Sequence, residues 1–133
     1  MIDNFFDTLP DTKIRKPKPP DTRPLEREVQ NGIIAALERR DVYVQRVNAG
    51  QFQHEGRYIA GAVAGHSDLY GTLAPTGRAW FIEVKRRGEK PTPKQARFLA
   101  ARAAEGCIAG YADTVAGALA LLGLKPNCRE AEQ

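Results

Sequence analysis

The segment "RAWFIEVK" (Arg78 to Lys85) most constrains the fold, because it joins a strand apolar enough for a core to two opposite charges near its end. Side chains alternate across a strand, so Glu83 and Lys85 lie on one face while Ile82 and Val84 lie on the other. The face that carries the charges is therefore predicted either to meet water or to form a chemical site.

The sequence before this strand predicts a helix followed by further strands. Residues 25–40, "LEREVQNGIIAALERR", have helical periodicity, with an apolar stripe made of Leu25, Val29, Ile33 and Leu37. Strands are predicted at residues 42–48, 68–73 and 78–85, the last two as a hairpin-like pair joined by the turn "APTG". The segment "NAGQFQHEGR" between the first two strands is predicted to be a loop.

Two more helices and one more strand are predicted after it. "TPKQARFLAARAAEG" predicts a helix with Thr92 as N-cap, Pro93 at its first position and Gly106 at its end. "CIAGYA" predicts a short buried strand, and "DTVAGALALLG" predicts a last helix capped by Asp113 or Thr114. The order αβββαβα predicts an α/β or α+β domain built in layers.

Length and composition indicate one domain with tails. The chain has 133 residues, of which 42% are hydrophobic and 27% charged. We place a flexible, proline-rich basic arm at residues 1–24, the domain at residues 25–124 and a C-terminal tail at residues 125–133. Because no apolar run reaches about 18 residues and the N-terminus lacks a signal-peptide pattern, we expect a cytoplasmic protein with no membrane partner. Cys107 and Cys128 form neither a disulfide framework nor a zinc-binding pattern.

Basic residues are concentrated just after the charged strand. From Arg86 to Arg102 there are six basic residues against the single acid Glu89, whereas the whole chain has a net charge of only +4. This segment is predicted to bind a polyanion such as nucleic acid. The arm contains "KIRKPKPP" and is predicted to be either a solvated leader or a basic strap that touches phosphates or a partner subunit.

Three acids and a lysine are the candidate chemical residues. Glu26 falls within the apolar stripe of the first helix and is predicted to face the interior, Asp68 begins a strand, and Glu83 lies beside Lys85. Carboxylates that converge require a cation, and a set of oxygen ligands suits Mg²⁺ or Mn²⁺ better than zinc. Such a site serves the hydrolysis of a phosphodiester, in which a nearby ammonium steadies developing negative charge.

Each of these residues also has a purely structural interpretation. A Glu-x-Lys sequence on a strand is usually a charge pair that faces solvent, and an aspartate such as Asp68 often begins a turn. Glu26 could pair with an arginine such as Arg46. Gln95 matches the last position of a capping box, so its place in a site and its place in a helix cap are both open.

The motifs "GHSDLYG", "FIEVKRRGEKPTPKQARFL" and "LEREVQ" resemble those of the VRR-NUC (virus-type replication-repair nuclease) branch of the PD-(D/E)xK nuclease superfamily. The resemblance spans residues 25–122 and is strengthened by "RVNAG" (residues 46–50) and by a glutamine downstream of the E-x-K motif. It implies a restriction-endonuclease-like three-layer core, with a mixed β-sheet flanked by helices.

The resemblance also implies roles for individual residues. Asp68 and Glu83 become metal-binding carboxylates, the backbone carbonyl of Val84 an additional ligand, and Lys85 the catalytic lysine. Glu26 matches the family's acidic residue on the first helix, a metal ligand directly or through a water, and Gln95 matches the glutamine of the helix after the E-x-K strand. One departure is visible, because Ser67 stands where the superfamily name places a proline.

Small stand-alone members of this family are associated with phages and act as homodimers on branched DNA. The expected function is therefore a Mg²⁺- or Mn²⁺-dependent, structure-selective DNA endonuclease, similar to a Holliday-junction resolvase and encoded by a bacterium or a phage. A C2 dimer would supply the symmetry needed to cut both strands of a four-way junction. The residues expected to contact DNA are Arg46, Asn48, Arg86, Arg87, Lys90 and Lys94.

Three alternatives remain from the sequence. A flap, nicking or restriction-like nuclease that acts on linear DNA would use the same residues. A non-catalytic nucleic-acid-binding module would keep the fold without the chemistry. A scaffold protein would carry the same acids as surface pairs and would have no affinity for DNA.

Overall fold

The computed structural model describes residues 16–47 and 51–133, with the backbone alone for residues 51–54 and 58–60. It contains three α-helices, six strands and a short 3-10 helix within this part of the chain. The helices are α1 (Glu26–Glu38), α2 (Pro93–Ala104) and α3 (Val115–Leu121), with the 3-10 helix η2 (Glu130–Glu132) near the C-terminus. The strands are β1 (Tyr43–Arg46), β2 (Gln51–His54), β3 (Arg57–Ala60), β4 (Leu69–Leu73), β5 (Arg78–Val84) and β6 (Ile108–Ala112).

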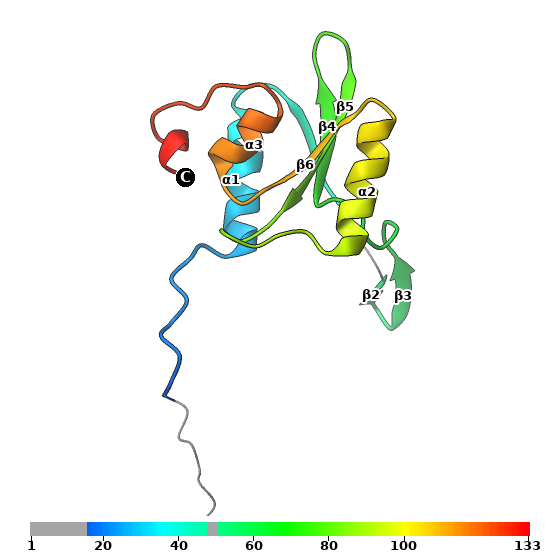
Figure 1. Cartoon of the computed structure of the whole chain (residues 1–133). Coiled ribbons are helices and arrows are strands. Elements are labelled where there is room, and N and C mark those ends of the chain that lie inside the picture. The colour runs from blue at the N-terminus through cyan, green and yellow to red at the C-terminus, as the bar shows by residue number, and fades with distance from the viewer. Residues whose placement is uncertain (1–15, 48–50) are drawn as a thin grey trace, which may run out of the picture.

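Four of the strands form a mixed sheet in the order β1-β4-β5-β6, in which β1, β4 and β5 are antiparallel and β5 and β6 are parallel. Helices α1 and α3 pack together on one face of this sheet, and α2 lies against β5 and β6 on the other (Figure 1). The expected mixed sheet flanked by helices is therefore confirmed as an α/β arrangement. Asn48 lies outside the described residues.

The core lies between the sheet and the pair α1 and α3. Ile82 and Val84 of β5 are fully buried there, as are Ile33 and Leu37 of α1. Gly71 of β4 is required at this interface, because an added Cβ atom would fall only 1.8 Å from the Tyr43 carbonyl oxygen and 2.6 Å from the ring of the buried Trp80. The alternation predicted for β5 thus places its apolar residues against the α1 and α3 layer.

The segment predicted to be a loop instead contains a second hairpin. Strands β2 and β3 pair with each other and not with the main sheet, so the loop prediction is wrong. The strands are joined by Glu55 and Gly56, which both have positive φ, the conformation favoured in a two-residue hairpin turn. Each strand has only four residues, too few for alternation to stand out beside the flanking glycines.

Helix caps follow the predicted pattern. Thr92 Oγ1 accepts a hydrogen bond from Gln95 N at 3.3 Å, Pro93 begins α2, and Gly106 follows the helix with a φ of +94°. Thr114 Oγ1 accepts a hydrogen bond from Gly117 N at 3.0 Å and caps α3. Asp113, the other predicted cap, has a different partner, described below.

Two expectations about burial are wrong. Leu25 was expected in the apolar stripe but is 56% exposed, because it stands before the first turn of α1, outside the stretch that packs on the sheet. β6 was expected to be buried, yet only Ala112 among its residues is, because β6 is an edge strand of the sheet. Within the described residues, we find no helix that combines the length and apolar character needed to cross a membrane.

Residues 125–133 pack against the domain. Glu130 of η2 is fully buried and its carboxylate accepts hydrogen bonds from Arg39 Nη2 at 2.7 Å and from Arg40 Nη1 at 2.9 Å. Hydrogen bonds with these arginines and with the Asn127 amide hold the pKa of Glu130 well below its usual range. At its end the chain joins α3, where Ala116 N donates to the Gln133 carbonyl at 3.3 Å.

Candidate active site

Asp68 and Glu83 come together because their strands are neighbours. The register pairs Leu69 with Ile82, so the residue before Leu69 lies opposite the residue after Ile82. Asp68 is fixed there by its own carboxylate, because Asp68 Oδ2 accepts a hydrogen bond from Val84 N at 2.9 Å. The predicted convergence of these two carboxylates is therefore present in the structure.

Glu83 is buried, with only 2% of its surface exposed. Its Oε1 accepts a hydrogen bond from Gln95 Nε2 at 2.7 Å and lies 3.8 Å from Lys85 Nζ. Its Oε2 is also buried and has no hydrogen-bond partner among the described residues. A buried carboxylate oxygen without a partner is costly, so this oxygen is a candidate ligand atom for a cation.

The pKa of Glu83 reflects this environment. Burial raises it from its ordinary value of 4.5 to about 8, helped by the negative charge of the adjacent Asp68 and opposed by the charge of Lys85. Two adjacent carboxylates cannot both ionise cheaply unless a positive charge lies between or beside them. Lys85 supplies part of that charge, and its side chain is 12% exposed, so the interpretation of the E-x-K motif as a solvent-facing pair is wrong.

Gln95 serves the helix cap and the site at once. Its Oε1 accepts a hydrogen bond from Thr92 N at 2.9 Å, which completes the capping box, while its Nε2 donates to Glu83. Because α2 begins over β5, the first turn of the helix covers the charged face of the strand. The helix-cap interpretation of Gln95 is therefore correct, and the same side chain also contacts the candidate site through Glu83.

Glu26 lies at the rim of the site and not inside it. Its side chain is exposed in the first turn of α1, so the prediction that it faces the interior is wrong. Partial burial is the main cause that raises the pKa of Glu26. The negative charge of Asp68 raises this pKa further, while the charge of Lys85 lowers it. Glu26 is thus close enough to the Asp68 and Glu83 pair to feel its charge, and it makes no hydrogen bond or ion pair within the described chain.

Ser67, which stands where the superfamily has proline, is fully enclosed at 1% exposure. Its hydroxyl donates a hydrogen bond to the Leu69 carbonyl at 3.0 Å, and its own carbonyl lies 2.9 Å from His66 Nδ1. These two contacts restrain the backbone on both sides of Asp68. The serine therefore supplies local stiffness by hydrogen bonding where a proline would supply it covalently.

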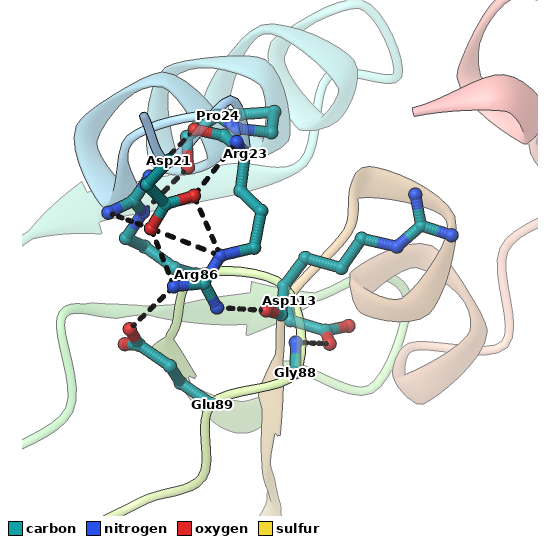
Figure 2. Close-up of polar contacts among 8 residues, drawn as sticks. Asp21, Arg23, Pro24, Arg86, Gly88, Glu89 and Asp113 are labelled. Carbon is teal, nitrogen blue, oxygen red and sulfur yellow. Dashed lines mark hydrogen bonds and ion pairs between the residues drawn. The ribbon is translucent and has the colours of Figure 1, made fainter. Parts of the chain in front are cut away.

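Arg86 holds the base of the N-terminal arm against the domain (Figure 2). Its Nε and Nη2 donate to the carbonyls of Pro24 at 3.1 Å and Arg23 at 2.7 Å, and its Nη1 lies 3.0 Å from Asp21 Oδ2. All three guanidinium nitrogens are thus engaged by the arm. Arg86 was expected to contact DNA, but its donors are used within the protein.

Further contacts complete this clamp, which we define as Asp21, Arg23, Arg86 and the loop 87–89. Arg23 Nη1 donates to the Arg87 carbonyl at 2.6 Å, and Arg23 Nη2 lies 3.7 Å from Glu89. The loop is tied in turn to the start of α3, because Gly88 N donates to Asp113 Oδ2 at 2.9 Å. The arm therefore leaves the domain beside the residues that follow Lys85, a contact that the sequence did not indicate.

The other residues expected to contact DNA are placed as follows. Arg46 is exposed on β1 and its Nη2 donates to Asn31 Oδ1 at 2.6 Å, so it does not pair with Glu26. Arg87, Lys90 and Lys94 are exposed after β5 and at the start of α2. Asn48 falls outside the described residues.

Aromatic residues next to the acidic pair were missed by the sequence analysis. His66, Tyr70, Phe81 and Phe98 form a cluster in which neighbouring ring centroids lie 4.5 to 6.3 Å apart. The available signal was alternation, because Tyr70 and Phe81 are each two residues from an acid of the site and share its face.

No group of three or more histidine, cysteine, aspartate or glutamate side chains is arranged to hold a metal ion by itself within residues 16–47 and 51–133. The candidate site thus consists of the Asp68 and Glu83 carboxylates, with Lys85, Gln95 and the more distant Glu26 around them. Comparison of the sequence with models of known protein families gives no match, and comparison with curated proteins gives none either.

Proposed function

We propose that this chain is a divalent-metal-dependent endonuclease of the VRR-NUC type that hydrolyses phosphodiester bonds in DNA. One observation carries the proposal: Glu83 is buried beside Asp68, and one of its carboxylate oxygens has no hydrogen-bond partner among the described residues. A folded protein that brings two acids together in this way gains most when a cation binds between them.

The donor set fits Mg²⁺ or Mn²⁺. Mg²⁺ is typically bound through one or two carboxylates and keeps several waters, so the two acids suffice without a third acidic side chain. Asp68 and Glu83 would hold the ion, with the Val84 carbonyl as a further ligand and Glu26 acting through a water. When bound, such an ion polarises a phosphoryl oxygen and lowers the pKa of a bound water.

The surrounding residues have distinct tasks in this proposal. The Lys85 ammonium, which lies 3.8 Å from Glu83, stabilises negative charge that develops on the phosphate oxygens. Gln95 orients the Glu83 carboxylate through its 2.7 Å hydrogen bond, and Val84 N orients that of Asp68. Both acids are therefore positioned before substrate arrives, which reduces the reorganisation needed during the reaction.

We further propose that the substrate is branched DNA, such as a four-way junction, and that the active form is a homodimer. The resemblance of the motifs to VRR-NUC nucleases supports both points. The sheet order β1-β4-β5-β6, with α1 before it and α2 between β5 and β6, is compatible with a restriction-endonuclease-like core and supports the nuclease itself. Exposed Lys90 and Lys94 beside the site supply phosphate contacts.

The test is cleavage of a labelled synthetic four-way junction with and without Mg²⁺, beside flap, duplex and single-stranded substrates. Lys85→Ala and Asp68→Asn are expected to lower the cleavage rate about 100-fold or more. Glu38→Gln, which changes an exposed acid at the far end of α1, is the matched control and is expected to cleave at the wild-type rate. Mass measurement in solution, by sedimentation, checks the dimer.

Each alternative predicts a different outcome. Full cleavage by both Lys85→Ala and Asp68→Asn would contradict the proposed catalytic site. Cleavage confined to flap or linear DNA would show that the enzyme acts on those substrates and not on four-way junctions. DNA binding without cleavage, and without Mn²⁺ binding that Glu83→Gln weakens, would identify a non-catalytic binding module.

A further inference from the structure

The aromatic cluster of His66, Tyr70, Phe81 and Phe98 lies directly beside the acidic pair. Tyr70 follows Asp68 by two residues along β4, and Phe81 precedes Glu83 by two residues along β5. Residues two apart on a strand share a face and lie about 7 Å apart. The cluster and the acids therefore occupy one continuous surface on the α2 side of the sheet.

Tyr70 is the exposed member of the cluster and is held in place by the others. Its ring stacks at 6.3 Å and 21° against Phe81 and meets His66 edge-on at 6.2 Å. Despite these contacts it remains 36% exposed. A large ring that is fixed on one side and open on the other is preorganised to stack with a planar ligand.

Tyr43 extends this surface onto the next strand. It pairs in register with Thr72, which is two residues from Tyr70 and on the same face, so the two tyrosines are diagonal neighbours. Tyr43 is 53% exposed. Helix α2 packs on β5 and β6, and the two tyrosines on the neighbouring strands β1 and β4 are both exposed.

The border of this surface is basic. Helix α2 contains Lys94, Arg97 and Arg102 and no acidic residue. The Lys94 side chain packs against Gly65, next to His66, and the Arg102 guanidinium lies 5.1 Å from the Phe98 ring centroid while also pairing with Glu105 at 2.8 Å. Partly exposed rings beside basic side chains are the arrangement by which proteins bind single-stranded nucleic acid.

We propose that Tyr70 and Tyr43 form a stacking surface for unpaired nucleobases of the DNA strand that enters the acidic pair. This inference rests on the proposed nuclease function and specifies its substrate class. A base that stacks on Tyr70 places its phosphate toward Asp68 and Glu83, whereas bases in an intact duplex are already stacked on one another. The enzyme thus prefers branched DNA that has unpaired bases next to the cleaved bond.

Binding in the absence of divalent ions tests the surface without cleavage. Fluorescence anisotropy would compare a 15-nucleotide oligothymidine with a duplex of the same length, in EDTA, using the full chain. Tyr70→Ala and Tyr43→Ala are each expected to weaken binding of the single strand about tenfold and of the duplex less than about twofold. Tyr70→Phe keeps the ring and is expected to bind like the wild type.

Thr72→Ala is the matched control. Thr72 is exposed on the same face, pairs in register with Tyr43 and is two residues from Tyr70, but it carries no ring. It is expected to leave both affinities unchanged. The surface is rejected if the wild type does not bind the single strand more tightly than Tyr70→Ala, or if the tyrosine variants weaken both DNAs equally. Tyr43→Ala keeps the test decisive if Tyr70→Ala lowers the melting temperature, because Tyr43 is mostly exposed.

The same proteins separate this inference from the function on which it rests. Cleavage of branched DNA by the wild type, with no preference for unpaired bases and no effect of Tyr43→Ala, would reject the stacking surface and leave the nuclease. Ring-dependent binding of the single strand without Mg²⁺-dependent cleavage would reject the nuclease and leave the stacking surface as a binding site.

Discussion

At the scale of single residues, Glu83 dominates the behaviour of the site without metal. Burial, and then the charge of Asp68, raise its pKa from 4.5 to about 8, so the folded protein binds a proton there that the unfolded chain releases at lower pH. The stability contributed by this proton is complete below about pH 4.5 and is lost progressively up to about pH 8. In EDTA, the melting temperature of the wild type is expected to fall across this window more than that of Glu83→Gln, as measured by circular dichroism.

Metal binding should reverse this dependence. A divalent ion favours the ionised carboxylate, so it displaces the proton and binds more tightly as the pH rises. Mg²⁺ is expected to raise the melting temperature of the wild type more at pH 8 than at pH 6, and to leave Glu83→Gln nearly unchanged. An equal shift in both proteins at both pH values would mean that the ion binds elsewhere.

At the scale of elements, Gly71 sets how closely β1, β4 and the Trp80 ring approach one another. A methyl group at this position would lie 1.8 Å from the Tyr43 carbonyl oxygen and 2.6 Å from the Trp80 ring. Gly71→Ala is expected to lower the free energy of unfolding by about 3 kcal/mol, since overpacking forces backbone shifts. Urea denaturation measures this change. Gly77→Asn is the control, because Gly77 lies in a turn with positive φ, a conformation that asparagine tolerates. Similar stability of both variants would contradict the prediction.

The clamp around Arg86 joins the base of the N-terminal arm to the domain. Arg86→Ala removes the three contacts that the Arg86 guanidinium makes with Asp21, Arg23 and Pro24 and leaves the contact of Arg23 with the Arg87 carbonyl, so backbone hydrogen exchange within residues 21–25 is expected to accelerate. Arg87→Ala is the matched control, because Arg87 contributes its carbonyl to the clamp, and this group remains in the variant. Mass spectrometry of the exchanged peptides compares them, and equal exchange would show that Arg86 does not hold the arm.

At the scale of the whole molecule, Glu130 joins the C-terminal residues to α1. Its pKa is held well below the usual range, chiefly by hydrogen bonds from Arg40, so its contribution to stability is present above about pH 4.5 and is lost as the pH falls toward the folded pKa. Glu130→Gln is expected to be less stable than the wild type at pH 7, with the difference shrinking toward pH 2.5. Urea midpoints across this range provide the measurement, and a constant difference would exclude the carboxylate charge as the cause.

Local patterns predicted much of the fold, because they depend on neighbouring residues. Alternation in "RAWFIEVK" placed Glu83 and Lys85 on one face, and the Thr92-to-Gln95 cap located the start of α2. The hairpin of β2 and β3 was missed because its strands are short. The burial predicted for Leu25 and Glu26 was wrong, because helical periodicity assigns residues to a face of the helix without showing how far the sheet extends beneath it.

The sequence by itself determined which residues share a face, because the periods of strand and helix are properties of the local backbone. Only the tertiary structure decided what covers each face. Glu83 is buried because α2 packs over it. The Arg86 guanidinium is bound by the arm because Arg23, 63 residues earlier in the sequence, lies beside it. Glu130 keeps its charge in a buried position because Arg40, 90 residues away in sequence, donates hydrogen bonds to it. Such contacts depend on segments that meet only on folding, and alternation carries no information about them.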